Sequence, residues 1–289
     1  MNVMSTVDKK RIQKNFDGKA DRYESCAILQ KEVCQRMLER LDLVALQPNV
    51  IVDCGAGTGW GVQGLMQRYK KANVIAVDIS LPMLQQSRRK GGWLRKPGLL
   101  CADAEALPLQ DESVDLVFSN LMLQWCDAQQ VFSEFKRILK PGGLLMFSTF
   151  GTDTLKELKA SWRAVDDDLH VNEFADMHDL GDALLQTGLA EPVMDMDVIT
   201  LTYKDALSVM TDLKSIGANT ALNKSNKGLM TPEKIRKVIE AYEEFRRDDL
   251  IPASFEVVFG HAWKLQQRPA KMSSSEFSIS LADIPRPHK

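Results

Sequence analysis

The sequence lacks the features that would assign it to a membrane, secreted or nucleic-acid-binding class. Its 37 basic and 39 acidic residues nearly cancel, so no bulk electrostatic field favours nucleic acid or an anionic membrane. No apolar run approaches the length of a bilayer span, and the charged residues 8–11 are not followed by the apolar stretch of a secretory signal. We therefore expect a cytoplasmic protein with neither nucleic acid nor membrane as a partner.

Cysteine and histidine are also scarce. The five cysteines are odd in number and form no C-x-x-C pair, and the four histidines are scattered. Reduced thiols are the plain interpretation of this pattern, and we expect no bound metal. With 289 residues, the chain is long enough for one large domain with appendages.

A glycine-rich turn is the most informative feature that is present. Residues 50–59 read Val-Ile-Val-Asp-Cys-Gly-Ala-Gly-Thr-Gly, which is an apolar run, an acid and then glycine at every second position. The run predicts a buried parallel strand, and the glycines let a ligand lie directly against the main chain. A second such run, residues 73–78, ends in Asp78, which is placed to accept hydrogen bonds from a ribose diol. Together these features predict a nucleoside ligand.

A dinucleotide site is the alternative to consider, because residues 59–64 match G-x-G-x-x-G literally. That match begins six residues after the strand ends at Asp53, where a helix should already be running. A register that starts at Gly55 places the bulky Trp60 where a glycine is needed for close helix–strand packing. Asp53 would also repel a pyrophosphate, whereas it suits the sulfonium and ammonium of S-adenosylmethionine. The pattern favours a methyltransferase-type site over a nicotinamide site.

The rest of the chain predicts a Rossmann-like α/β fold with helices on both faces of a parallel sheet. Expected strands are 50–53, 73–77, 98–101, 114–119 and 144–149, and expected helices are about 59–70, 82–90 and 128–139. After residue 150 we expect helices at about 153–164 and from 176, and strands at 193–203 and 255–264. These would complete a seven-stranded sheet with an antiparallel last strand. The predicted domains are a helical N-terminal cap (1–47), a methyltransferase domain (48–265) with helical insertions at about 152–190 and 204–250, and a disordered tail (266–289).

Ligands of such sheets sit outside the carboxyl ends of the strands, which selects the candidate cofactor residues. Asp103 is placed to accept from an adenine amino group, and the fourth strand ends beneath the methionine part of the ligand. Capping roles for Asp78 and Asp103, and a strand-closing role for Asn120, remain open alternatives. The candidates are Asp53, Gly55, Ala56, Gly57, Asp78, Ile79, Asp103, Ala104, Asn120 and Leu121.

Longer motifs carry a family resemblance. The runs VDCGAGTG, VDIS, ADAEALPL, FSNLMLQW and LKPGGLL resemble the class I S-adenosylmethionine-dependent methyltransferases over about residues 48–150. Phe16-x-x-x-Ala20-x-x-Tyr23, residues 148–155 (STFGTDTL) and His170-x-Asn172-x-Phe174 are similar to the malonyl-acyl-carrier-protein O-methyltransferases of biotin synthesis. That resemblance spans roughly residues 11–264. Mitochondrial assembly factors that hydroxylate an arginine look partly similar, so a protein arginine hydroxylase or a small-molecule methyltransferase remains an alternative.

The resemblance implies a substrate, a co-substrate and a partner. S-adenosylmethionine would methylate the free carboxylate of a malonyl thioester carried on the phosphopantetheine of acyl carrier protein, or on coenzyme A. A carboxylate is already ionised at neutral pH, so it needs no general base. We expect Lys214 or His170 to contact the malonyl end and Tyr23 to close the pocket. A solvated lysine, a capping histidine and a packed tyrosine are the alternatives. Basic runs at 87–90 with 95–96, and at 9–11, are candidate docking sites for the acidic carrier.

Overall fold

Short apolar runs form the strands of a seven-stranded sheet in the computed structural model, which describes residues 8–93, 95–216 and 231–266. The strand order is β3-β2-β1-β4-β5-β7-β6. Strands β1 to β5 run parallel, and β7 is antiparallel to both β5 and β6. The predicted fold and its antiparallel last strand are confirmed. The strands are β1 (Val50–Cys54), β2 (Asn73–Asp78), β3 (Gly98–Cys101), β4 (Val114–Asn120), β5 (Leu139–Phe150), β6 (Ala190–Tyr203) and β7 (Ile251–Trp263).

Alternation along the strands divides the core into two apolar layers, one on each face of the sheet. In β1, Ile51 belongs to one layer and Val52 to the other. The Ile51 layer packs beneath α3 (Ile28–Arg40), α4 (Trp60–Arg68) and α5 (Leu81–Ser87). The Val52 layer packs beneath α6 (Ala128–Ile138) and α8 (Met177–Thr187). Helices therefore cover both faces, as the alternation of strands and helices predicts.

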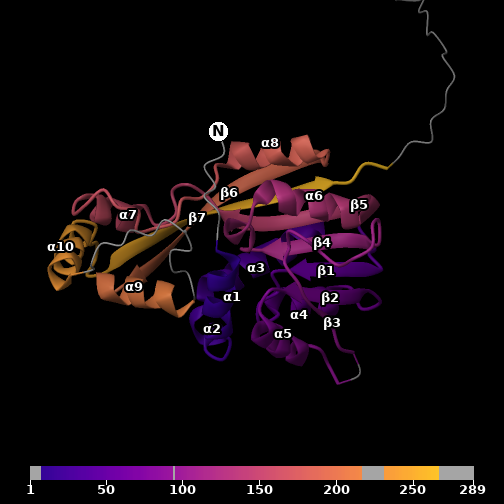
Figure 1. The fold of residues 1–289 in the computed structure, drawn as a ribbon, viewed down its shortest axis with the longest axis horizontal. Helices are drawn as coiled ribbons and strands as arrows, with labels where there is room; N and C mark the ends of the chain where they lie inside the picture. The colour runs from indigo at the N-terminus through magenta and orange to yellow at the C-terminus, as the bar shows by residue number, and fades with distance from the viewer. Residues whose placement is uncertain (1–7, 94, 217–230, 267–289) are drawn as a thin grey trace, which may run out of the picture.

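The remaining elements gather around the carboxyl ends of the parallel strands and the far end of the two long strands. Figure 1 shows β6 and β7 extending beyond the other strands to a group formed by α7, α9 and α10. These elements are α1 (Lys9–Asp17), α2 (Tyr23–Cys26), α7 (Lys156–Arg163), α9 (Ala206–Ser215), α10 (Pro232–Glu243), η1 (Leu41–Leu43), η2 (Arg88–Lys90) and η3 (Leu123–Trp125). Within the described part of the chain, no helix combines the length and the apolar character needed to span a bilayer.

Some boundaries differ from the sequence prediction. Strand β5 begins at Leu139 rather than 144, because Leu139 pairs with Val114 ahead of an irregularity in the register. Gly142 has φ +79°, so Gly142 and Gly143 lie within the strand and bend it. Strand β7 begins at Ile251, four residues earlier than predicted. The tail prediction falls on residues 267–289, and part of the second helical insertion on 217–230, which lie outside the described residues.

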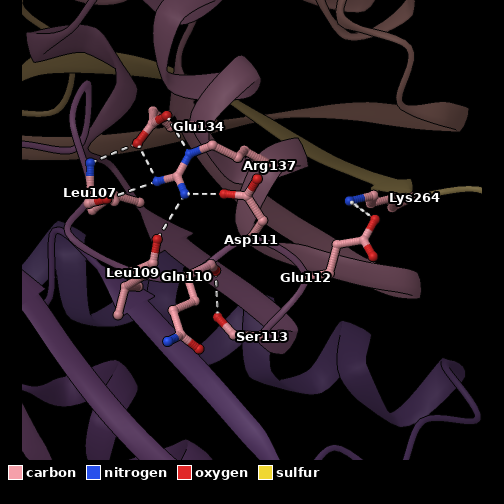
Figure 2. A network of polar contacts seen from close by, with 9 residues as sticks. All are labelled: Leu107, Leu109, Gln110, Asp111, Glu112, Ser113, Glu134, Arg137 and Lys264. Carbon is pink, nitrogen blue, oxygen red and sulfur yellow. Dashed lines mark hydrogen bonds and ion pairs between the residues drawn. The ribbon is translucent and has the colours of Figure 1, made fainter.

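A polar network fixes the loop that connects β3 to β4, as Figure 2 shows. Arg137 of α6 donates to the carbonyl oxygens of Leu107 and Leu109, at 2.8 and 2.7 Å. The same guanidinium binds Glu134 and Asp111. These carboxylates raise the pKa of Arg137 above its usual value. The network ties the loop after Cys101 to α6.

Candidate functional site

The turn after β1 requires glycine for two different reasons. Gly55 and Gly57 have φ +76° and +52°, in the left-handed region that glycine adopts without strain. A Cβ on Gly55 would lie 2.5 Å from Cβ of Met122, whereas a Cβ on Gly57 would meet no atom within 4 Å. The amides of Gly55 and Ala56 both donate to the carbonyl of Val77, which holds the turn against β2. The turn is therefore fixed in place, with open space at Gly57.

Asp78 faces this turn. Its Oδ2 accepts from the amide of Gly57 and its Oδ1 from the amide of Ser80, both at 2.8 Å. Ser80, and not Asp78, is the N-cap of α5, so capping does not account for this acid. Burial raises the pKa of Asp78 to about 6, although its backbone hydrogen bonds act in the opposite direction.

Asp53 lies behind the turn, close enough to Asp78 for the two carboxylates to interact. It is 2% exposed, and its Oδ2 has no hydrogen-bond partner among the described residues. Burial, followed by the charge of Asp78, raises the pKa of Asp53 to about 7. A Cβ on Gly61 would lie 2.5 Å from the same Oδ2, so only glycine leaves the carboxylate in this position. Two adjacent buried acids with raised pKa values suit a positively charged ligand.

Most of the predicted cofactor residues line one cavity, which we call the first cavity. The structure places Asp53 and Ala56 behind its wall rather than on it. Met83 and Ile79 provide an apolar surface beside Asp78 that suits a flat aromatic ring. The predicted residues that line the first cavity are Tyr23, Gly55, Gly57, Asp78, Ile79, Asp103, Ala104, Asn120 and Leu121.

Asp103 holds a turn and also lines the first cavity. Its Oδ1 accepts from the amide of Glu105 at 3.0 Å, which is the turn-capping alternative, and the side chain also lines the first cavity. The ammonium of Lys9 in α1 lies 3.0 Å from Asp103 and 2.7 Å from Glu105. Burial lowers the pKa of Lys9, but Cys126 and these two carboxylates outweigh it and hold that pKa above its usual value.

The end of β4 is held by a side-chain network. Asn120 donates to the carbonyl of Gln30 at 3.0 Å and accepts from the hydroxyl of Ser148 at 2.9 Å. Leu121 has φ +48°, an uncommon conformation that costs about 1–3 kcal/mol and is often found at functional sites. Its amide donates to Ser148, so the strained residue is fixed at the cavity wall. Asn120 thus positions α3 and Leu121 as well as lining the cavity.

Several cavity residues were not predicted from the sequence. Lys9 appeared there only as a docking candidate, and Gln30 was not among the predicted site residues. Gln30 lines the first cavity, and its Oε1 is buried without a partner among the described residues. Gln13 donates to the carbonyl of Ile79 at 3.0 Å and so fastens α1 over the site. In the sequence, only the motif Phe16-x-x-x-Ala20-x-x-Tyr23 indicated that the N-terminal segment belongs to the site.

A second cavity adjoins the first, since Trp125, Phe150 and Ile216 line both. The ring of Phe16 packs edge-on against that of Trp125, with centroids 5.7 Å apart. Apolar side chains dominate the wall. The residues lining the second cavity are Trp125, Phe150, Thr154, Leu155, Leu158, His170, Val171, Asn172, Phe174, Leu213, Ile216 and Phe255.

The three predicted substrate residues lie in different places. Tyr23 lines the first cavity, where burial and the charge of Asp78 raise its pKa. His170 lines the second cavity and stacks on Trp162. Lys214 is exposed on α9, whereas Leu213 of the same helix and Ile216, which directly follows it, line the second cavity. The phase of the helix therefore directs Lys214 away from the site.

His170 also belongs to a small polar cluster. Its Nε2 lies 2.7 Å from Oδ1 of Asp166, and the ammonium of Lys234 lies 2.8 Å from Oδ2 of the same residue. Lys234, more than His170, lowers the pKa of Asp166 to about 2. Potential ligand atoms of Asp166, Asp168 and His170 lie within 4.8 Å of one another. Because Lys234 already compensates the charge of Asp166, the cluster is satisfied by the protein itself.

Solved structures share this fold. The YcgJ protein from Bacillus subtilis superposes with a TM-score of 0.56 at 15% identity, covering 81% of this chain and 99% of its own. A SAM-dependent methyltransferase from Thermotoga maritima gives a TM-score of 0.52 at 18% identity, covering 88% of this chain and 99% of its own. At this level of identity the likeness concerns the fold alone.

Comparison with sequence relatives identifies the family more specifically than the fold does. The family described as "Methyltransferase domain" matches residues 52–147. The malonyl-[acyl-carrier protein] O-methyltransferase of Gallionella capsiferriformans is 49% identical over 267 residues, covering 89% of this chain and 91% of the relative. The protein of that name from Nitrosospira multiformis is 47% identical, with coverage of 89% and 90%. The chain therefore belongs to the family of malonyl-[acyl-carrier protein] O-methyltransferases.

Proposed function

We propose that this protein transfers a methyl group from S-adenosylmethionine to the free carboxylate of a malonyl thioester carried by acyl carrier protein. The observation that carries this proposal is the 49% identity with a relative of that activity, sustained over 89% of this chain. The geometry supports it, because the first cavity combines buried acids, a glycine turn and an adjoining acceptor space. The product would be a malonyl methyl ester, the starting unit for biotin synthesis.

The first cavity would hold the co-substrate. S-adenosylmethionine supplies an electrophilic methyl group on a positively charged sulfonium. Asp78 would accept hydrogen bonds from the ribose diol, since the amides of Gly57 and Ser80 already orient its carboxylate. Asp103 would accept from the adenine amino group beside the apolar wall formed by Ile79. The buried charge of Asp53 would attract the ammonium and sulfonium from behind the turn.

The second cavity would hold the malonyl group. Its walls exclude water, and it meets the first cavity at Trp125, Phe150 and Ile216. The acceptor carboxylate is ionised at neutral pH, so alignment and desolvation are the main tasks of the protein. Well-aligned intramolecular reactions gain about 7–11 kcal/mol from such positioning. Tyr23 would close the first cavity, and His170, oriented by Asp166, would contact the malonyl end in the second cavity.

Methylation would remove the negative charge of the malonyl group. A free carboxylate at the end of an acyl chain is costly to bury in an apolar site. Its methyl ester is neutral, so the masked unit can enter chain-elongating enzymes that accept plain acyl groups. The functional consequence of the methylation would therefore be the removal of this charge.

The direct test is to mix the purified protein with S-adenosylmethionine and malonyl-acyl carrier protein, and to weigh the carrier by intact mass spectrometry. We expect a gain of one methyl group, abolished by Asp78→Ala. Succinyl-acyl carrier protein, which has one more methylene, serves as the control for acceptor length. No gain on an active malonyl carrier would contradict the proposal, and would favour the arginine hydroxylase or small-molecule methyltransferase alternative.

A further inference from the structure

A third space, at the surface, adjoins the second cavity. His170, Val171 and Phe174 line both the second cavity and a groove along α7, which we call the outer groove. The outer groove lies between α7 and the segment 168–174. Because the second cavity also shares lining residues with the first, the three spaces adjoin one another in order from the proposed methyl donor to the surface of α7.

The residues that line these spaces change from apolar in the second cavity to charged in the outer groove. The inner part is apolar, with Leu155 and Leu158 of the α7 region at its side. The outer groove instead carries the three basic side chains of α7, namely Lys156, Lys159 and Arg163. Lys156 and Arg163 are exposed, and neither forms an ion pair with a residue that the structure describes. Their charges are therefore available to a ligand.

Lys159 lies deeper in the same groove. Its ammonium donates to the carbonyl of Thr152 at 2.8 Å and sits 5.2 Å from the centroid of the Phe174 ring. Burial, and then the neighbouring charge of Arg163, lower its pKa. The repulsion between these two cations would be relieved by an anion bound beside them.

Acidic side chains limit what the outer groove can accept. Asp153, Asp168 and Glu173 also line it, so its overall charge is mixed. A broad acidic protein face would meet these carboxylates as well as the cations. A single anionic group on a narrow, otherwise uncharged chain would contact the cations alone, and the space beyond Val171 would receive the rest of that chain.

Resting on the proposed function, we propose that the outer groove binds the phosphodiester of the phosphopantetheine arm and that the arm runs through the second cavity. The phosphodiester lies at Lys156, Lys159 and Arg163. The amide-linked chain passes Val171, and the thioester end reaches the junction at Phe150 and Ile216. The carrier protein then stands over α7.

Part of the basic runs predicted as docking sites is engaged within the protein. Lys9 is paired with Asp103 and Glu105. Lys90 lies 2.6 Å from Glu24, and Arg95 donates to backbone carbonyl groups such as that of Met66. The other basic residues of those runs, such as Lys10, Arg88 and Lys96, are exposed, but none of them lines the second cavity or the outer groove. The basic residues of α7 do line the outer groove, which favours α7 as the entrance.

The test compares two small acceptors that differ only in the phosphate, malonyl-phosphopantetheine and malonyl-pantetheine. The parent protein should prefer the phosphorylated acceptor by about tenfold in kcat/KM, as expected for a charge-assisted contact. In the double variant Lys156→Ala/Arg163→Ala, this ratio should fall towards one. The matched control is Lys70→Ala/Lys71→Ala, two exposed lysines just before β2, at the opposite edge of the sheet. Its ratio should equal that of the parent.

An unchanged ratio in the α7 variant would overturn the assignment of the groove. If the parent protein methylated neither the two small acceptors nor malonyl-acyl carrier protein, that result would instead refute the proposed function. A second variant, Val171→Trp, tests the passage itself. It should lower kcat/KM for both acceptors at least tenfold while the Kd for S-adenosylmethionine stays unchanged. Full turnover by a folded Val171→Trp protein would exclude this route.

Discussion

Replacing Asp53 by asparagine should stabilise the ligand-free protein at neutral pH and weaken its affinity for S-adenosylmethionine. The carboxylate is buried, its Oδ2 lacks a partner among the described residues, and Asp78 adds a like charge. Asparagine has nearly the same shape and no charge. The substitution therefore removes an electrostatic cost from the empty site together with the attraction that the ligand would use.

The magnitude follows from the raised pKa. A change from 3.8 to about 7 corresponds to about 4 kcal/mol at about 1.4 kcal/mol per pH unit. Because the folded-state pKa lies above the unfolded value, the protonated acid contributes its stability fully below pH 3.8. That contribution is lost as the pH rises through about 7. Relative to Asp53→Asn, the parent should therefore lose about 2.6 kcal/mol between pH 5 and pH 8.

Urea denaturation of both proteins at the two pH values measures this difference. Asp115→Asn is the control of opposite sign. Burial of Asp115 is outweighed by its hydrogen bonds to Lys140 and the amides of Asn49 and Val50, so its pKa is lowered. That substitution should destabilise the protein at pH 8.

Calorimetry of ligand binding provides the second half of the test. The affinity of the parent for S-adenosylmethionine should rise between pH 6 and pH 8 with release of protons, because the cation favours ionised Asp53. Asp53→Asn should bind at least tenfold more weakly and lose this proton release. A stability difference that does not change with pH, or equal affinity in the two proteins, would refute the reasoning.

Three further substitutions test the structure around the site. Gly61→Ala should weaken binding of S-adenosylmethionine about tenfold by calorimetry, because the added Cβ would lie 2.5 Å from Oδ2 of Asp53. Gly92→Ala, whose Cβ meets nothing within 4 Å, should bind normally, and equal weakening in both would contradict the packing argument. Arg137→Met should lower the free energy of unfolding by about 2–3 kcal/mol in urea, because it removes the contacts to the Leu107 loop. A loss below 0.5 kcal/mol would contradict this expectation, because it would show that contacts other than those of Arg137 hold the Leu107 loop. Tyr242→Phe should cost about 1 kcal/mol through loss of its 2.9 Å bond to the Pro252 carbonyl, and no change in melting temperature would oppose that assignment.

The sheet and its glycine turn could be predicted because their causes are local. An apolar run followed by alternating glycines allows few conformations, and the observed φ values at Gly55 and Gly57 follow from that chemistry. Asp78 ends β2, and the parallel pairing of β2 with β1 places that end beside the turn after β1. Nearly all candidate cofactor residues therefore fall at the wall of one cavity or directly behind it.

The acceptor side of the site could not be predicted in the same way, because it depends on contacts between distant segments. Lys214 was expected to contact the malonyl end, but the phase of α9 exposes it and directs Leu213 towards the second cavity. Lys9 meets Asp103 across 94 residues, and no periodicity in either segment indicates that pairing. Tertiary packing decides these residues, so the structure is needed to identify them.

The most direct test of the central claim is the position of the transferred methyl group. Reaction with S-adenosylmethionine carrying a ¹³C-labelled methyl group, followed by NMR of the malonyl product, distinguishes a methyl ester from a methyl group on carbon. Carboxylate methylation predicts a single methoxy signal that disappears after ester hydrolysis. A labelled methyl group on the carbon between the two carbonyl groups would contradict it, because that transfer requires a general base to remove a proton first.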